Sequence, residues 1–333
     1  MTTSRTRWGI LGTGWVAHEF TSDLLRNGFH VTAVGSRSQS SANAFATEFG
    51  IGTAHDSYAA LAADDNVDAI YVSTPHPFHW PHARLGLEAG KHVLLEKPFT
   101  VNAREAHDLV AFAAQQNLLI MEAMWTRFVP HMVRVREIIA AGTIGEVRTL
   151  IADHNQALPT DPHHRVNDLN LGGGALLDLG VYPVSFAEEL FGTPLVVHAL
   201  AAKTGTGVDR QTGIMLGYAG GQQAILQCAL DTNGPNTATI MGTKGWIAID
   251  TVWHDASSFT LYQGEDNVIE RFEFQVPGRG MHYQAEEFER LIERGATVST
   301  IMSPESSISV MDTLDEIRRQ IDLSYPSDSP VEH

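Results

Sequence analysis

A lysine stands directly after a short apolar run that is typical of a buried strand. The run, Val93 to Leu95, suits a strand covered on both faces of a parallel sheet. The sequence then reads Glu96-Lys97-Pro98, and proline cannot continue a central strand. Ligands of open α/β sheets lie outside the carboxyl ends of the strands. We therefore interpret Lys97 as a candidate for chemistry; the alternative is a surface lysine in a strand-to-helix turn.

A glycine-rich turn near the start of the chain predicts a dinucleotide site. Residues 12–17 read Gly-Thr-Gly-Trp-Val-Ala, the G-x-G-x-x-A pattern, and they follow a strand candidate, Trp8 to Leu11. Gly12 allows the tight turn, and Gly14 lets the backbone approach a pyrophosphate. The helix that begins here offers unpaired N–H groups to the phosphates. The residues expected to bind the cofactor at this turn are Gly12, Gly14, Trp15 and Val16.

The end of the second strand candidate, Val31 to Gly35, distinguishes between the two dinucleotides. An acid at this place accepts the ribose 2′-hydroxyl of NAD, whereas an arginine accommodates the 2′-phosphate of NADP. This chain has Ser36, Arg37 and Ser38 there, and no acid. Arg37 can bind a phosphate in bidentate fashion, and the serines can add hydroxyl donors. The sequence therefore favours NADP; the alternative is that Arg37 is a solvated residue at a helix start.

The next strand candidate, Asp68 to Val72, ends in a stretch rich in histidine and proline. His76, His79 and His82 are spaced by three residues, so a metal site has to be weighed. Prolines interrupt the stretch and no nearby acid or cysteine completes a ligand set, so we expect no metal. The stretch instead belongs to the carboxyl edge of the predicted sheet, where the cofactor binds. The further residues predicted to line that crevice are Ser73, Thr74, His76, His79, Glu96 and Lys97.

Strands and helices alternate as far as Met124, and we predict a doubly wound Rossmann domain over residues 1–124. Seven strand candidates between Val196 and Phe274 follow, joined by short turns that are typical of an antiparallel meander. We therefore predict a second, α+β domain over residues 125–333 with a large, open, mostly antiparallel sheet. The helix candidates lie at 41–49, 58–62, 103–116, 131–141, 283–294 and 310–323.

Two polar residues of the second domain follow a run of three glycines. Asp178 and Tyr182 are four apart, so they share a face if the segment is helical. Pro183 then requires a kink or a helix restart near Val181. A loop predicted over His154 to Leu171 precedes them and is longer than most loops in compact domains, which makes it a candidate for substrate contact.

The composition restricts the class of partner. The chain has 333 residues, a net charge of −17 and one cysteine, Cys228. The charge argues against nucleic acid and anionic membranes as partners but not against a small anionic ligand. One cysteine excludes an intramolecular disulfide, and we find no apolar stretch long enough for a membrane helix. We expect a cytoplasmic protein. Since the open sheet would expose a large apolar patch, which monomers rarely do, we also expect a homodimer through that sheet.

Taken together, these features resemble the glucose–fructose oxidoreductase / inositol dehydrogenase (Gfo/Idh/MocA) family over essentially the whole chain. Glu96-Lys97-Pro98 is the most specific short motif. Within the family the chain is most similar to the branch of dimeric dihydrodiol dehydrogenases and NADP-dependent D-xylose 1-dehydrogenases. The stretches that carry this likeness are Ser36-Arg37, His76-Pro77, residues 122–128, 172–182, 242–245 and 278–283.

The resemblance implies an acid/base role for Tyr182, at a position where many relatives have histidine. A free tyrosine has a pKa near 10 and is a poor base, but a cation such as Lys97 within about 4–6 Å favours the phenolate. Asp178 is then expected to orient Lys97 or a substrate hydroxyl. Trp125 and Trp253 can supply apolar walls for a ring. The residues expected to bind substrate are Trp125, Arg127, His154, Asp178, Tyr182 and Trp253.

The function expected from the resemblance is hydride transfer between NADP and a hydroxyl of a sugar, a cyclic polyol or a trans-dihydrodiol. Two alternatives remain. One is an NADPH-dependent reductase of a ketosugar such as 1,5-anhydrofructose, with the same site residues. The other is a non-catalytic NADP-binding sensor.

Overall fold

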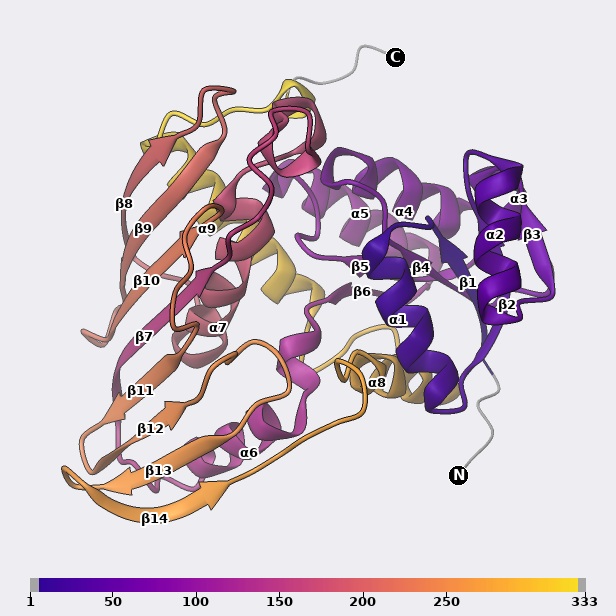
Figure 1. The fold of residues 1–333 in the computed structure, drawn as a ribbon. Helices are drawn as coiled ribbons and strands as arrows, with labels where there is room; N and C mark the ends of the chain where they lie inside the picture. Colours follow the sequence, from indigo (N-terminus) through magenta and orange to yellow (C-terminus); the bar gives the residue numbers. More distant parts are fainter. Residues whose placement is uncertain (1–5, 329–333) are drawn as a thin grey trace. The chain divides into compact units, whose positions relative to one another are not determined.

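The computed structural model describes residues 6–328, which form two compact units (Figure 1). The first unit contains the described residues up to Thr100 together with Arg104–Trp125 and Pro277–Ser307. The second contains Val101–Ala103, Thr126–Val276 and the described residues from Ile308 onward. Each unit is built around one β-sheet.

A six-stranded parallel sheet of order β3-β2-β1-β4-β5-β6 forms the centre of the first unit and confirms the predicted Rossmann fold. Every residue of β4 is buried, as expected for a strand covered on both faces. The strand order changes direction at β1, so the switch point where ligands bind lies at the end of that strand. The elements are β1 (Arg7–Leu11), α1 (Trp15–Arg26), β2 (His30–Gly35), α2 (Gln39–Phe49), β3 (Thr53–His55), α3 (Tyr58–Ala62), β4 (Ala69–Val72), η1 (His76–Phe78), α4 (His79–Glu88), β5 (His92–Glu96), α5 (Ala103–Gln116) and β6 (Ile120–Ala123).

A helix from far along the chain completes the core of the first unit. Helix α8 (His282–Glu293) places Phe288 against Trp8 of β1, with ring centroids 5.3 Å apart. The Trp8 indole N–H donates to Glu289 at 2.8 Å, and Phe20 of α1 also contacts the same ring, with centroids 5.8 Å apart. Because the Trp8 side chain is fully buried, this hydrogen bond satisfies a polar group that would otherwise be costly to bury.

An eight-stranded sheet forms the second unit, in the order β14-β13-β12-β11-β7-β10-β9-β8. All pairs are antiparallel except β7 with β10, which confirms the predicted open, mostly antiparallel sheet. More exposed and less exposed residues alternate along most of β7 to β10, and α7 packs on β7 and β10. The strands are β7 (Val147–Asn155), β8 (Val196–Lys203), β9 (Asp209–Gly217), β10 (Gln223–Ala229), β11 (Ala238–Gly242), β12 (Gly245–Ile249), β13 (Phe259–Gln263) and β14 (Asn267–Phe272). The helical segments are η2 (Trp125–Phe128), α6 (Pro130–Ala140), η3 (Arg165–Asn167), η4 (Leu169–Leu171), η5 (Leu176–Gly180), α7 (Val181–Phe191), α9 (Pro304–Gln320) and η6 (Pro326–Asp328).

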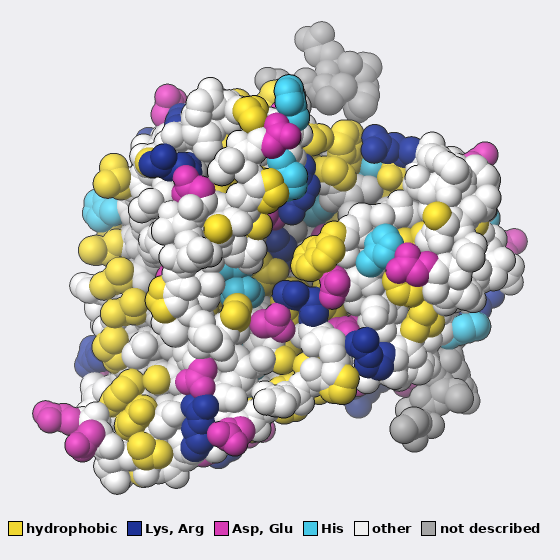
Figure 2. Space-filling view, in the orientation of Figure 1, with side chains coloured by type: hydrophobic (Ala, Val, Ile, Leu, Met, Phe, Trp, Pro, Cys, Tyr) yellow, Lys and Arg dark blue, Asp and Glu magenta, His cyan; other side chains and the backbone are white. Residues whose placement is uncertain are grey.

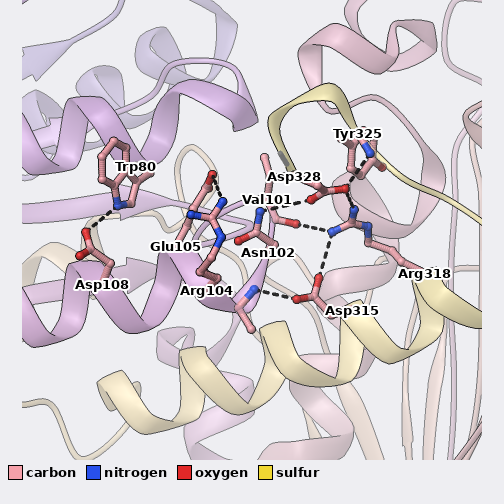
Figure 3. Close-up of polar contacts among 11 residues, drawn as sticks. Trp80, Val101, Asn102, Arg104, Glu105, Asp108, Asp315, Arg318, Tyr325 and Asp328 are labelled. Atoms are coloured by element: carbon pink, nitrogen blue, oxygen red, sulfur yellow. Dashed lines mark hydrogen bonds and ion pairs between the residues drawn. The ribbon is translucent and has the colours of Figure 1, made fainter. Parts of the chain in front are cut away.

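A buried arginine fixes the segment at residues 101–103 to helix α9 within the second unit (Figure 3). Arg318 donates to the Val101 carbonyl oxygen and to Asp315, both at 2.9 Å, and it also pairs with Asp328. Asp315 in turn accepts the Ala103 N–H at 2.9 Å. Two carboxylates thus balance one buried guanidinium, which would otherwise be strongly destabilising.

Three segments differ in detail from the sequence predictions. Strand β7 continues to Asn155, so the predicted loop over His154 to Leu171 is wrong at its start: His154 is a strand residue. Helix α9 begins at Pro304 rather than near Val310, because the Ser303 hydroxyl accepts the Ser306 N–H and caps it. Strand β3, with three residues, and helix α4 were not predicted.

The sequence predicted a kink or a helix restart near Val181, and the helix changes its type at that position. A π-helical turn, η5, ends at Gly180, and α7 begins at Val181. Gly180 and Val181 both have helical φ and ψ, so the helix is continuous there, and Pro183 stands directly after the π-helical turn. No helix within residues 6–328 has the length and apolar character needed to cross a membrane.

Candidate active site

The turn between β1 and α1 brings three strand ends of the first unit together. Gly12 has a φ of +111°, and its N–H donates to the Gly35 carbonyl oxygen at 3.0 Å. A Cβ at Gly12 would lie 2.9 Å from the Ser73 hydroxyl, so only glycine fits. Around Gly14 nothing lies within 4 Å of such a Cβ. Trp15, the first residue of α1, is 66% exposed. The backbone at the start of α1 is thus accessible, as pyrophosphate binding requires.

The residues after β2 lie next to the same turn. Ser36 is buried, with its hydroxyl 3.5 Å from that of Thr13. The Ser38 hydroxyl accepts the Ser41 N–H and caps α2. Arg37 lies beside Tyr58: burial raises the pKa of that phenol, and Arg37 opposes the rise. Hydroxyl groups and one guanidinium therefore meet here, a donor set that suits a phosphate.

The end of β5 is held by a buried carboxylate. The Tyr71 phenol donates to Glu96 Oε1 at 2.5 Å, and the Lys97 N–H donates to Glu96 Oε2 at 3.2 Å. Glu96 is buried. It therefore fixes the backbone from which the Lys97 side chain extends, and β4 and β5 are tied together at the carboxyl edge of the sheet.

The two predicted histidines of the first unit are buried, and their rings lie 5.6 Å apart. His79 Nδ1 lies 2.8 Å from the Pro98 carbonyl oxygen, and Nε2 lies 2.7 Å from that of Thr74. Burial lowers the pKa of His79 to about 4, so the neutral ring donates to one of these carbonyls at a time. His79 thus links the residues after β4 to the residues after β5.

Tyr182 of the second unit lies against two stacked histidines. The rings of His154 and His254 have centroids 3.7 Å apart, and the Tyr182 ring lies 5.0 Å from the first and 5.2 Å from the second. All three side chains are buried, with 7% of Tyr182 exposed. They come from β7, α7 and the connection between β12 and β13, so tertiary packing alone assembles the cluster.

Asp178 lies on the π-helical turn before Tyr182. Arg165, which belongs to η3, approaches its carboxylate at 3.4 Å. The Arg165 side chain is 45% exposed, whereas that of Asp178 is nearly buried. This long, half-exposed pair is weak in water. The Asp178 carboxylate can therefore exchange Arg165 for another partner at little cost in energy.

The structure places the adjacent residues Trp253 and His254 differently. Trp253 is fully buried, its indole N–H donates to the Asp153 carbonyl oxygen at 2.7 Å, and it stacks on Phe186. His254 contacts Tyr182 instead. Sequence reasoning did not select His254, because a strand connection gives no signal of which neighbour reaches another element.

The last two predicted substrate residues are both buried. Arg127 donates to the Ser185 hydroxyl at 3.1 Å and to the Ser185 carbonyl oxygen at 2.9 Å, so it secures α7 three residues after Tyr182. Trp125 belongs to the first unit and lies 5.5 Å from the guanidinium of Arg279. Across residues 6–328 no three His, Cys, Asp or Glu side chains are grouped as a metal site would need.

Fold and sequence comparisons agree on the class of protein. Residues 6–124 match the model for an oxidoreductase family with an NAD-binding Rossmann fold, and residues 132–248 match a GFO/IDH/MocA C-terminal domain. The chain is 37% identical over 337 residues to trans-1,2-dihydrobenzene-1,2-diol dehydrogenase of Mus musculus, covering 97% of this chain and 98% of the relative. For the Homo sapiens protein of the same name the identity is 34% over 338 residues, with the same coverage.

A solved structure is also similar along nearly the whole chain. KijD10, a 3-ketoreductase from Actinomadura kijaniata crystallised with NADP and TDP-benzene, superposes with a TM-score of 0.83 at 26% identity, over 95% of this chain and 98% of that one. The protein is thus an NAD(P)-dependent dehydrogenase acting on CH–OH groups. It belongs to the Gfo/Idh/MocA family.

Proposed function

We propose that the protein is an NADP-dependent oxidoreductase that moves a hydride between the nicotinamide and a hydroxyl-bearing carbon of a sugar, a cyclic polyol or a trans-dihydrodiol. Two features support this proposal. The fingerprint turn beside Arg37 is accessible, as cofactor binding requires, and Tyr182 is buried against two histidines. The relatives named as dihydrodiol dehydrogenases support the substrate class. We also propose that the first domain binds the cofactor and the second binds the substrate, in the cytoplasm.

For the cofactor, Arg37 and Ser36 are proposed to bind the 2′-phosphate of NADP. An arginine and two hydroxyls offer charge-assisted hydrogen bonds that a 2′-hydroxyl cannot use fully. NADP in the KijD10 structures is consistent with this preference. Arg37→Gln should therefore weaken NADPH binding about 10- to 100-fold and leave NADH binding close to native. Equal losses for both dinucleotides would contradict the assignment.

For the chemistry, Tyr182 is proposed to take the hydroxyl proton in oxidation and to return it in reduction. The nicotinamide, when bound, accepts or supplies the hydride. Lys97 is proposed to stabilise the Tyr182 phenolate, and Glu96 fixes the backbone that carries it. Asp178 is proposed to orient the reacting hydroxyl. Its carboxylate then has to exchange the ion pair with Arg165 for the substrate.

The direct test is cofactor reduction with a panel that holds D-xylose, D-glucose, inositol and a trans-dihydrodiol, alongside the reverse reaction of 1,5-anhydrofructose with NADPH. Turnover with NADP⁺ and one panel member supports the proposal. The reverse reaction alone would favour the alternative of a ketosugar reductase. The similar protein KijD10 is named a 3-ketoreductase, which supports testing this direction. Tight NADPH binding without any turnover would favour the other alternative, a non-catalytic NADP-binding sensor.

A homodimer through the outer face of the second sheet is the remaining part of the proposal. Ile225 of β10 pairs in register with Ile151 of β7 on one side and Met215 of β9 on the other, and all three are exposed. Leu200 of β8 is 80% exposed. Hydrophobic side chains gather along the left margin of Figure 2, where Figure 1 places β8 to β10. An exposed apolar row of this kind on a sheet favours a second copy as its cover.

The oligomer is tested by sedimentation. The native protein should sediment as a dimer at micromolar concentration, and Ile225→Lys should sediment as a monomer. Leu25→Lys serves as the control, because Leu25 is an exposed apolar residue on α1 of the first unit. A native monomer, or a dimer that survives Ile225→Lys, would contradict this interface.

A further inference from the structure

The loop that enters α8 is fastened to the helix that follows the dinucleotide fingerprint. Asp23 of α1 is buried, and its carboxylate accepts the Arg279 N–H at 3.1 Å and the Met281 N–H at 2.9 Å. Arg26, one turn further along α1, pairs with the same carboxylate at 3.1 Å and balances its charge. The bonds from Arg279 and Met281 join residues more than 250 positions apart in the sequence, within the first unit.

A glycine makes this close approach possible. Gly278 has a φ of +88°, and a Cβ there would lie 1.9 Å from Asp23 Oδ1 and 2.3 Å from an Arg26 nitrogen. Neither the conformation nor the space admits another residue. The backbone next to Arg279 is therefore fixed against α1 before any ligand binds.

Two indoles then place the Arg279 side chain. Its guanidinium carbon lies 5.3 Å from the Trp15 ring centroid and 5.5 Å from that of Trp125. Both distances are those of cation–π contacts. Trp15 is the first residue of α1, directly after Gly14, and is 66% exposed, whereas Trp125 is buried. The positive charge is thus held beside the helix start at which the fingerprint positions a pyrophosphate.

We propose that Arg279 binds the pyrophosphate of the dinucleotide, as a cofactor-binding residue supplied from outside the fingerprint. The proposal rests on the proposed NADP function. The fingerprint offers only backbone N–H groups to a doubly charged group, and the first turn of α1 contains no acid that would oppose it. A guanidinium adds a full charge and a fork of donors that matches two phosphate oxygens. Trp15 and Trp125 hold the Arg279 side chain beside the start of α1.

The test measures binding of three probes by calorimetry: NADPH, 2′-phospho-ADP-ribose, which keeps the pyrophosphate but lacks the nicotinamide, and adenosine 2′-monophosphate, which lacks the pyrophosphate. Arg279→Gln should weaken the first two about 10- to 100-fold and leave the third unchanged. Arg279→Lys should show a smaller loss, because an ammonium is a point charge without the fork. Arg37→Gln is the matched control and should weaken all three probes, adenosine 2′-monophosphate included, because each carries the 2′-phosphate.

Two results would overturn the proposal. Native affinity of Arg279→Gln for 2′-phospho-ADP-ribose would mean that the guanidinium only packs between the indoles or contacts an anionic substrate. A similar loss for all three probes would mean a general disturbance, which a lowered melting temperature would also reveal. Failure of the native protein to bind NADPH at all would sink the proposed function itself, and that result is distinct from selective failure of Arg279→Gln.

Discussion

Asp209 gives a stability prediction that follows directly from its surroundings. It is the first residue of β9 and is fully buried. Its Oδ2 accepts the Leu176 N–H at 2.8 Å and the Thr212 hydroxyl at 2.7 Å, whereas Oδ1 has no hydrogen-bond partner among residues 6–328. Leu176 begins the π-helical turn that carries Asp178. Asp209 therefore supports the segment that leads to Tyr182.

Burial raises the pKa of Asp209 to about 7, from an ordinary value of 3.8, although the bonds from Thr212 and Leu176 and the charge of Lys203 act in the opposite direction. The folded state thus holds a proton that the unfolded state releases near pH 4. Stability from this group is fully present below that pH and is lost as pH rises through 7. At about 1.4 kcal/mol per pKa unit, the free energy of unfolding falls by about 2 kcal/mol between pH 5 and pH 7.

Asp209→Asn removes the titration and keeps an oxygen that can accept both hydrogen bonds. We expect the free energy of unfolding of this variant, minus that of the native protein, to increase by about 3 kcal/mol between pH 5 and pH 8. Urea unfolding followed by circular dichroism at several pH values measures it. Asp266→Asn, at an exposed turn residue, is the control for general charge effects. Parallel pH curves for Asp209→Asn and the native protein would show that Asp209 does not titrate in this range in the folded state.

Two further stability predictions concern the first unit, both measured by urea unfolding at constant pH. Gly278→Ala should lower the free energy of unfolding by about 3 kcal/mol, because a strained φ and overlap with Asp23 add together, whereas Gly264→Ala has a positive φ but open space and should lose only about 1 kcal/mol. Equal losses would show that contact with Asp23 is not the cause. Tyr71→Phe should lose about 1–3 kcal/mol, because it leaves the buried Glu96 without its phenol donor, and a native value would mean that another group replaces it.

Local patterns predicted the parts of the fold that local physics determines. The strand at Val93 to Leu95 and the fingerprint turn are set by burial and by glycine geometry, so both were readable from the sequence. The contacts of Tyr182 with His154 and His254 join three distant elements, and no spacing rule encodes them. Likewise nothing local shows that residues 277–307 pack with the first unit, because that depends on Asp23 and Trp8.

The true start of helix α9 has a local signal in the sequence. Ser303-Pro304-Glu305 is a helix start, with a capping hydroxyl and proline at the first helical position, and it marks the beginning of α9. Strand β3 is different, because three half-exposed or exposed residues show no periodicity. Its pairing with β2 makes it a strand, and pairing is a tertiary property.

Tyr182→Phe tests the proposed acid/base role directly through its effect on hydride transfer, followed as formation of NADPH with the substrate found in the panel. Loss of the phenol should lower kcat about 100- to 10,000-fold while NADPH affinity stays native, because acid/base catalysis is lost and cofactor binding is not. Tyr218→Phe, which removes the hydroxyl of another buried tyrosine of the second unit, should keep native kcat. If Tyr182→Phe instead turns over at the native rate, Tyr182 is not the acid/base and the central claim is wrong.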